Sequence, residues 1–110
     1  MTSEHLTAVL AEKIMGWGVA PDRLLLGDRR WLPRWRFQPL TKLEHALQLV
    51  EKAATSYTLT VAEDGTFAAH VRIGERTGIA SGEPKAMAIT VAVARAIGLD
   101  VQDQVVGENR

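Results

Sequence analysis

The chain has 110 residues, of which 46% are apolar and 24% charged, so it can bury the core of one domain spanning residues 1–110 and is not a disordered polypeptide. Thirteen basic and thirteen acidic side chains cancel, which excludes a surface built as a whole for polyanions and leaves room for a local basic patch. The absence of cysteine excludes disulfide scaffolds, thiolate metal sites and cysteine nucleophiles.

The first predicted element is a helix over residues 3–16. Apolar residues recur at helical spacing from Leu6 to Trp17, a threonine or serine precedes them as an N-cap, and glycines follow. Residues 18–40 show no such periodicity, and proline or glycine interrupts them at four places, which predicts a long Arg/Trp-rich loop. Within that loop, the run RLLL at residues 23–26 fits either a short strand or a helical turn.

A second helix is predicted over residues 41–54. Thr41 and Glu44 have the spacing of a capping box, in which the threonine hydroxyl and the glutamate bind each other's backbone amides, so the helix should begin at Thr41. Its buried stripe should consist of six apolar residues, namely Leu43, Ala46, Leu47, Val50, Ala53 and Ala54.

Residues 57–73 are predicted to form a β-hairpin, because their apolar residues recur with a period of two. A three-residue turn over residues 63–65, with Gly65 in the left-handed conformation, pairs Val61 with Phe67 and places the apolar side chains of both strands on one face. The other face should be small and polar, with Thr58, Thr60, Ala62, Ala68, His70 and Arg72.

Residues 74–82 contain three glycines and no periodicity, which predicts the most mobile internal loop. A third helix follows over residues 84–97, with Pro84 in its first turn and Gly98 at its end. This helix is apolar on all sides and needs more than one neighbour, so either the first helix or a second subunit should cover its far side. On this ground we expect a homo-oligomer. The tail could add a short strand through Val101, Val105 and Val106.

These elements predict an α+β fold in which a small antiparallel sheet packs with three helices in an α/β/α sandwich-like arrangement. The N-terminus has acidic residues where a signal peptide would be basic, and the longest apolar run is interrupted and too short to span a bilayer. We therefore expect no membrane association and a place in the cytoplasm.

Three stretches resemble the phage ABA sandwich domain, a family of small proteins of phages and prophages. Residues 10–17, LAEKIMGW, are similar to the family's AEKVMGW-type helix end. Residues 41–52, ending LEHALQLVEK, are similar to its central helix, and residues 82–95 to its closing apolar helix with the preceding proline. The likeness covers residues 6–98 with gaps.

The chain departs from the family at residues 39–42, PLTK, where an aromatic residue and a Ser-Thr-Asp run are common, and residues 31–37 have no clear counterpart. The resemblance implies a fold and a phage context, with a bacterial host. It implies no catalytic residue, because no biochemical role is established for the family.

The Arg/Trp-rich loop is the strongest candidate for a binding site. Guanidinium groups bind phosphates in a forked geometry and indoles stack on bases, which favours a nucleotide-like ligand or a single-stranded nucleic acid. Tryptophans in a long loop also serve as core plugs or subunit interfaces, and this alternative stays open. Together with two polar residues of the hairpin, the candidate residues are Arg30, Trp31, Arg34, Trp35, Arg36, His70 and Arg72.

The other motifs are weaker candidates for a functional site than the Arg/Trp-rich loop. His5, His45 and His70 lie on separate elements without the spacing of a metal site, so we expect no metal and no cofactor. The run GIASGEPK at residues 78–85 could hold an anion at a helix N-terminus, but it lacks the P-loop pattern. No serine has a nucleophile motif around it, and no pair of acids suggests acid–base catalysis.

The sequence therefore predicts a small non-enzymatic phage or prophage protein that acts by binding, with sequestration of an anionic nucleotide-like molecule as one role. The alternatives are an assembly module, in which the Arg/Trp-rich loop and the third helix are oligomer interfaces, and a nucleic-acid-binding protein.

Overall fold

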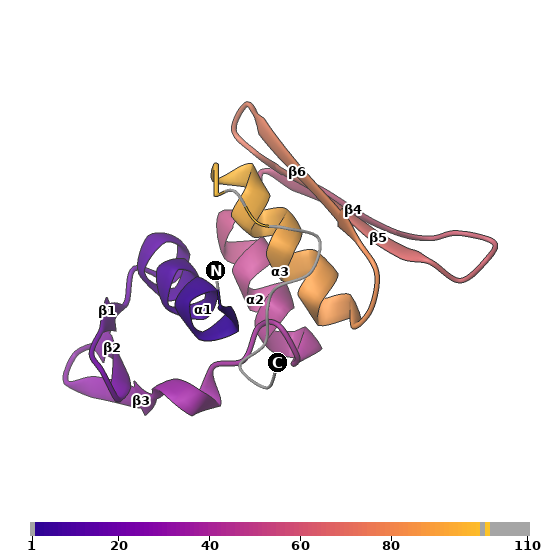
Figure 1. The fold of residues 1–110 in the computed structure, drawn as a ribbon. Coiled ribbons are helices and arrows are strands. Elements are labelled where there is room, and N and C mark those ends of the chain that lie inside the picture. Colours follow the sequence, from indigo (N-terminus) through magenta and orange to yellow (C-terminus); the bar gives the residue numbers. More distant parts are fainter. Residues whose placement is uncertain (1, 100, 102–110) are drawn as a thin grey trace.

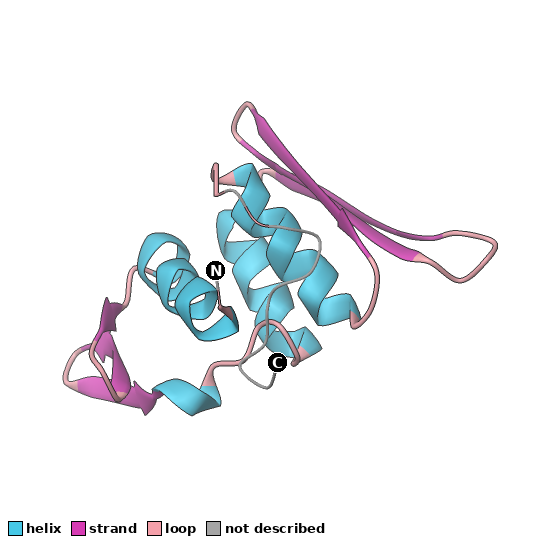
Figure 2. Ribbon diagram, in the orientation of Figure 1, coloured by secondary structure: helices cyan, strands magenta, loops and turns pink. Residues whose placement is uncertain are grey.

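The computed structural model describes residues 2–99 and 101, and its strands form two antiparallel sheets, in the orders β1-β2-β3 and β4-β5-β6 (Figures 1 and 2). The helical segments are α1 (Ser3–Leu10), the π-helix η1 (Ala11–Met15), the 3-10 helix η2 (Arg34–Arg36), α2 (Leu43–Ala53) and α3 (Lys85–Ala96). The strands are β1 (Gly18–Val19), β2 (Arg23–Gly27), β3 (Arg30–Pro33), β4 (Ser56–Val61), β5 (Phe67–Ile73) and β6 (Arg76–Ser81).

The predicted first helix is confirmed. The Thr2 hydroxyl accepts a hydrogen bond from the backbone amide of His5 (3.1 Å), which satisfies one of the free donors of the first turn. Helix α1 continues into η1, and Gly16 ends it in the left-handed conformation (φ 75°).

Residues 18–40 are not the irregular loop that the sequence suggests, because β1, β2 and β3 form a small sheet there. Asp28 and Arg29 both have positive φ (53° and 63°), as a two-residue hairpin turn requires. The RLLL run is a strand, with Leu24 buried and Leu25 exposed. Such short strands offer too few residues for a period of two to stand out.

Helix α2 is confirmed, but its start and its buried face differ from the prediction. Lys42 is the N-cap without a side-chain hydrogen bond, and the Thr41 hydroxyl donates instead to the side-chain oxygen of Gln38, so the capping box is wrong. Leu49 is fully buried, whereas Leu43 remains 45% exposed at the helix start. The buried face of α2 is therefore rotated toward Leu49 relative to the predicted stripe.

The hairpin is confirmed with the predicted register. Val61 pairs with Phe67 and Leu59 with Ala69, and Gly65 has φ 89° and donates its amide to the Ala62 carbonyl. Asp64 supports the turn, and the hydrogen bond from the Thr66 amide lowers the pKa of the Asp64 carboxyl.

The predicted mobile loop over residues 74–82 is wrong, since β6 occupies most of it and pairs with β5 along its whole length. The inward-facing residues of β6 are Gly78 and Ala80, which are too small to give an apolar signal in the sequence. Gly78 is required here because a methyl group on its Cα would overlap the Ala92 carbonyl oxygen of α3.

Helix α3 is buried within a single chain. It packs against β5 and β6 on one side and α2 on the other, and Val101 is also buried. Its apolar surface thus needs no second subunit, which removes the reason for expecting an oligomer through this helix. The predicted tail strand has Val105 and Val106 outside the described residues, and Val101 is not in a strand.

The α+β class is confirmed, but the layers follow a different order from the expected α/β/α sandwich. The helices lie between the two sheets (Figure 1). Helix α3 packs on the face of the sheet β4-β5-β6 that carries Phe67, Ala69 and Val71, and α2 packs on α3, so the helices of the described residues lie on one side of this sheet. Thr58, His70 and Ile79 on its outer face are exposed.

One buried hydrogen bond connects α3 to the segment before α2. Thr90 is fully buried, and its hydroxyl donates to the Pro39 carbonyl oxygen at 2.6 Å. We expect Thr90→Val to lower the free energy of unfolding by about 2 kcal/mol, because the isosteric side chain leaves that carbonyl without a donor. Urea denaturation of this variant and of the exposed Thr60→Val measures it, and equal stabilities would contradict the assignment.

Candidate functional site

The Arg/Trp segment is held on β2, β3 and η2, and its tryptophans do not plug the core. Trp31 is 56% exposed and Trp35 is 70% exposed. The Arg23 guanidinium lies 5.2 Å from the centre of the Trp31 ring, and that of Arg36 lies 5.7 Å from Trp35. Each indole is therefore exposed on the surface, with a guanidinium group close to its ring.

Arg23 is engaged by its neighbour. Its Nε lies 3.1 Å from the Asp22 carboxylate, and a second hydrogen bond of 3.2 Å completes the fork. These hydrogen bonds lower the pKa of the Asp22 carboxyl and raise that of the Arg23 guanidinium. Arg23 is therefore a weaker candidate for holding an anion than the other arginines of the segment.

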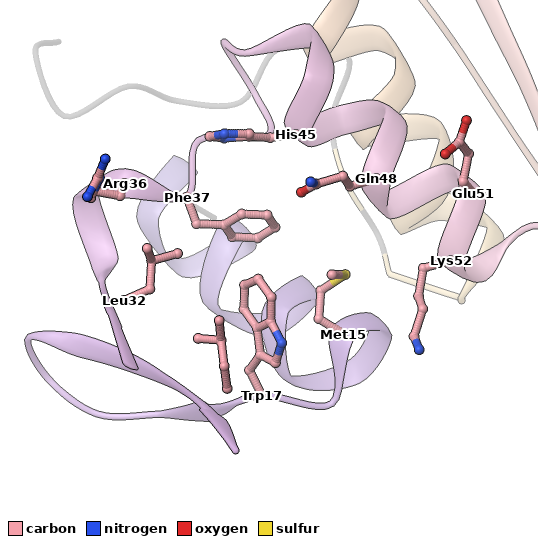
Figure 3. Close-up of a pocket in the computed structure, with 10 residues that line it drawn as sticks. Met15, Trp17, Leu32, Arg36, Phe37, His45, Gln48, Glu51 and Lys52 are labelled. Carbon is pink, nitrogen blue, oxygen red and sulfur yellow. The ribbon is translucent and has the colours of Figure 1, made fainter. Parts of the chain in front are cut away.

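A cavity of about 660 Å³ lies between η1, the small sheet, η2 and α2, and we name it the Phe37 pocket (Figure 3). Apolar and aromatic residues line its middle, with Arg36 of η2 at one end and polar residues of α2 at the other (Figure 3). Its lining consists of Met15, Trp17, Leu26, Leu32, Arg36, Phe37, His45, Gln48, Glu51 and Lys52.

Three aromatic rings form a continuous wall of this pocket. The Trp17 and Phe37 ring centroids lie 5.1 Å apart in an edge-to-face arrangement, and His45 stacks on Phe37 at 5.8 Å. The backbone amide of Gln38 donates to His45 Nδ1 at 3.0 Å, which fixes the ring and places the proton of the neutral imidazole on Nε2.

The polar groups of the Phe37 pocket are Arg36 at one end and the exposed face of α2 at the other. Gln48, Glu51 and Lys52 are exposed on this helix, and the small sheet and η2 convert their surroundings into a concave site. Arg36 and Lys52 provide two cations against one carboxylate, so the pocket favours an anion.

A second cavity of about 710 Å³ lies on the other side of Phe37, between α1 and the segments around residues 21 and 40. Arg34 and Trp35 line it together with two acids, Glu4 and Asp22. Arg34 also donates to the backbone carbonyls of Ala20 and Pro21, at 3.5 Å each. This cavity is less suited to an anion than the Phe37 pocket.

The structure separates the residues predicted to form one site. Arg36 lines the Phe37 pocket, Arg34 and Trp35 line the second cavity, and Arg30 and Trp31 lie on β3. The two remaining candidates, His70 and Arg72, lie on the outer face of β5, which is separated from the small sheet by the helices (Figure 1). Arg72 donates there to the Gly74 carbonyl at 3.0 Å.

Trp17, His45 and Lys52 line the Phe37 pocket, although the sequence does not mark them as candidates for a site. Trp17 continues the apolar periodicity of the first helix, and the other two lie on a helix face that carries other polar residues, so no local pattern distinguishes them. They meet only because the chain between them folds back as a sheet.

Residues 2–99 and 101 contain no group of three or more His, Asp or Glu side chains placed to hold a metal ion. In the same part of the chain, no helix has the length and apolar character needed to cross a bilayer.

The chain shares its α+β fold with a solved structure. That structure is the 2.0 Å crystal structure of a phage protein from Bacillus cereus ATCC 14579, with a TM-score of 0.73, 21% sequence identity and coverage of 93% of each chain. No family model and no curated protein matches the chain.

Proposed function

We propose that this protein is a small phage or prophage accessory protein that acts in the bacterial cytoplasm by binding an anionic, nucleotide-like molecule, without catalysis. The phage context is supported by the fold that the chain shares with the Bacillus cereus phage protein and by the resemblance of residues 10–17, 41–52 and 82–95 to phage ABA sandwich domains. The ligand class is supported by the Phe37 pocket, where three aromatic rings lie between two cationic side chains, Arg36 and Lys52.

The aromatic rings of the pocket suit the base of such a ligand, and its polar side chains suit the phosphate and the edge of the base. Aromatic side chains can stack on any of the bases, because every base has a π-face. In the pocket, Trp17 and His45 flank the buried Phe37 ring. The Arg36 guanidinium can donate two parallel hydrogen bonds to a phosphate, whereas Lys52 acts as a point charge. Gln48 offers both a donor and an acceptor for the edge of a base. The volume of about 660 Å³ lies within the range of small-molecule sites.

The test is titration calorimetry with a panel of nucleoside mono- and diphosphates and cyclic nucleotides. We expect Arg36→Ala to weaken the binding of a ligand by about tenfold to a hundredfold, because a hydrogen bond to a charged group contributes about 1.5–3 kcal/mol. Arg30→Ala is the matched control, since it removes the same charge from β3 outside the pocket.

Affinity unchanged in Arg36→Ala but lost in Arg34→Ala would move the site to the second cavity. The absence of heat for every ligand would refute the proposal. Sequestration adds one requirement, that chromatography after incubation recovers the bound nucleotide unchanged.

The exposed indoles of Trp31 and Trp35 favour a second candidate, a surface that contacts a macromolecule. A protein interface there makes the protein an assembly module, and Trp35→Ala would then dissociate the assembly in sedimentation. A single-stranded nucleic acid there would bind with a steep salt dependence set by the neighbouring arginines.

A further inference from the structure

The sheet β4-β5-β6 has two edges, and they differ in how well their backbone groups are shielded from pairing with a further strand. At the β6 edge, the Arg95 side chain donates to the Ile79 carbonyl at 2.7 Å, so a charged side chain occupies a backbone group that a further strand would need. At the β4 edge, all six residues from Ser56 to Val61 are exposed. No charged residue or proline lies in this strand.

The hydrogen-bond ladder determines which backbone groups of β4 face outward. The Ala62 amide donates to Thr66 across the hairpin, and the groups of an antiparallel strand alternate between its two sides. The amides and carbonyls of Thr58 and Thr60 therefore face β5, and those of Tyr57, Leu59 and Val61 face away from it.

The side chains at those same positions form an uncovered apolar surface. Tyr57 is 41% exposed, Leu59 37% and Val61 62%, although they share a face with the buried residues of β5. Helix α3 packs on β5 and β6, which leaves the strip along β4 in contact with solvent. An unpaired backbone edge and an apolar strip thus coincide on one strand.

We infer that β4 is the contact surface for a second copy of this chain, which pairs with it edge to edge and antiparallel. Centred on Leu59, the pairing places Tyr57 of each copy opposite Val61 of the other, an aromatic and β-branched combination that is favourable across strands. The three pairs supply about six hydrogen bonds, because each outward-facing pair exchanges two. The apolar strips of the two copies then meet on one face of a continuous sheet.

Charge determines the direction of the pairing. The hairpin turn next to β4 carries Glu63 and Asp64, whereas the strand itself is neutral. Parallel pairing would bring the two acidic turns together, and antiparallel pairing places them at opposite ends. The interface is therefore isologous, with the same patch contributed by both copies.

The proposal is tested by sedimentation and by residue-resolved amide hydrogen exchange over a range of protein concentrations. We expect dimers, with the amides of Tyr57, Leu59 and Val61 protected only at high concentration and those of Thr58 and Thr60 protected throughout. Val61→Lys should raise the dimer dissociation constant at least about tenfold, because a buried unpaired charge is unfavourable at an interface. Ile79→Lys, which adds the same charge at a comparably exposed β-branched residue, should leave it unchanged.

The orientation has its own readout, since the chain has no native cysteine. Spin labels on Asp64→Cys should lie about 33 Å apart, from ten residues of strand between the two turns. A monomer at every concentration, a dimer without concentration-dependent protection in β4, or labels in close contact would each overturn the proposal. The exchange experiment uses the unaltered chain, so it decides even where Val61→Lys fails to fold.

Discussion

Replacement of Gly78 by alanine is expected to lower the free energy of unfolding by about 3 kcal/mol, at the upper end of what overpacking a core costs. The added methyl group would overlap the Ala92 carbonyl oxygen and lie 2.5 Å from the Ala96 backbone nitrogen. Both are main-chain atoms of α3 and cannot turn aside as a flexible side chain would. The helix and the sheet would have to separate.

Chemical denaturation measures this loss, and the neighbouring Thr77→Ala is the control. Thr77 lies on the same strand with its side chain exposed on the other face, so the change should stay within about 0.5 kcal/mol. If Gly78→Ala is as stable as Thr77→Ala, the close packing of α3 on β6 is wrong.

Leu49→Ala is expected to lower the free energy of unfolding by about 3 kcal/mol, since it removes a fully buried side chain of α2 and leaves a cavity. Leu43→Ala on the same helix makes the same chemical change at a residue that is 45% exposed, and should cost less than about 1 kcal/mol.

The comparison separates two faces of α2. Thermal or urea denaturation of both variants gives the two values under identical conditions. Equal losses, or a greater loss for Leu43→Ala, would mean that the helix is rotated relative to its position between α3 and η1, as the periodicity of the sequence alone suggests.

The sequence predicts the elements whose signal is local and repeated. The register of the hairpin follows from the alternation of apolar residues and from Gly65, and the structure confirms it. The first two helices follow from their apolar periodicity, and α3 from an apolar run with Pro84 before it and Gly98 after it. Strand β6 escaped prediction because the residues that face α3 are Gly78 and Ala80, whose small size reflects the close packing of a helix that lies later in the chain.

The candidate site was predictable only in part. The cluster of arginines and tryptophans is visible in the sequence, but neighbouring residues of η2 line different cavities, with Arg34 and Trp35 on one and Arg36 on the other. The Phe37 pocket joins residues from η1, the small sheet and α2. Its composition depends on tertiary contacts such as the stacking of His45 on Phe37, which no spacing along the chain encodes.

The three tryptophans occupy unlike surroundings, and this makes the chain its own optical probe. Trp17 lines the Phe37 pocket, while Trp31 and Trp35 extend into solvent. Replacing the two solvent-exposed indoles by phenylalanine would leave a single emitter beside the aromatic wall. The emission maximum and intensity of its fluorescence would then report on ligand binding in the pocket without any attached dye.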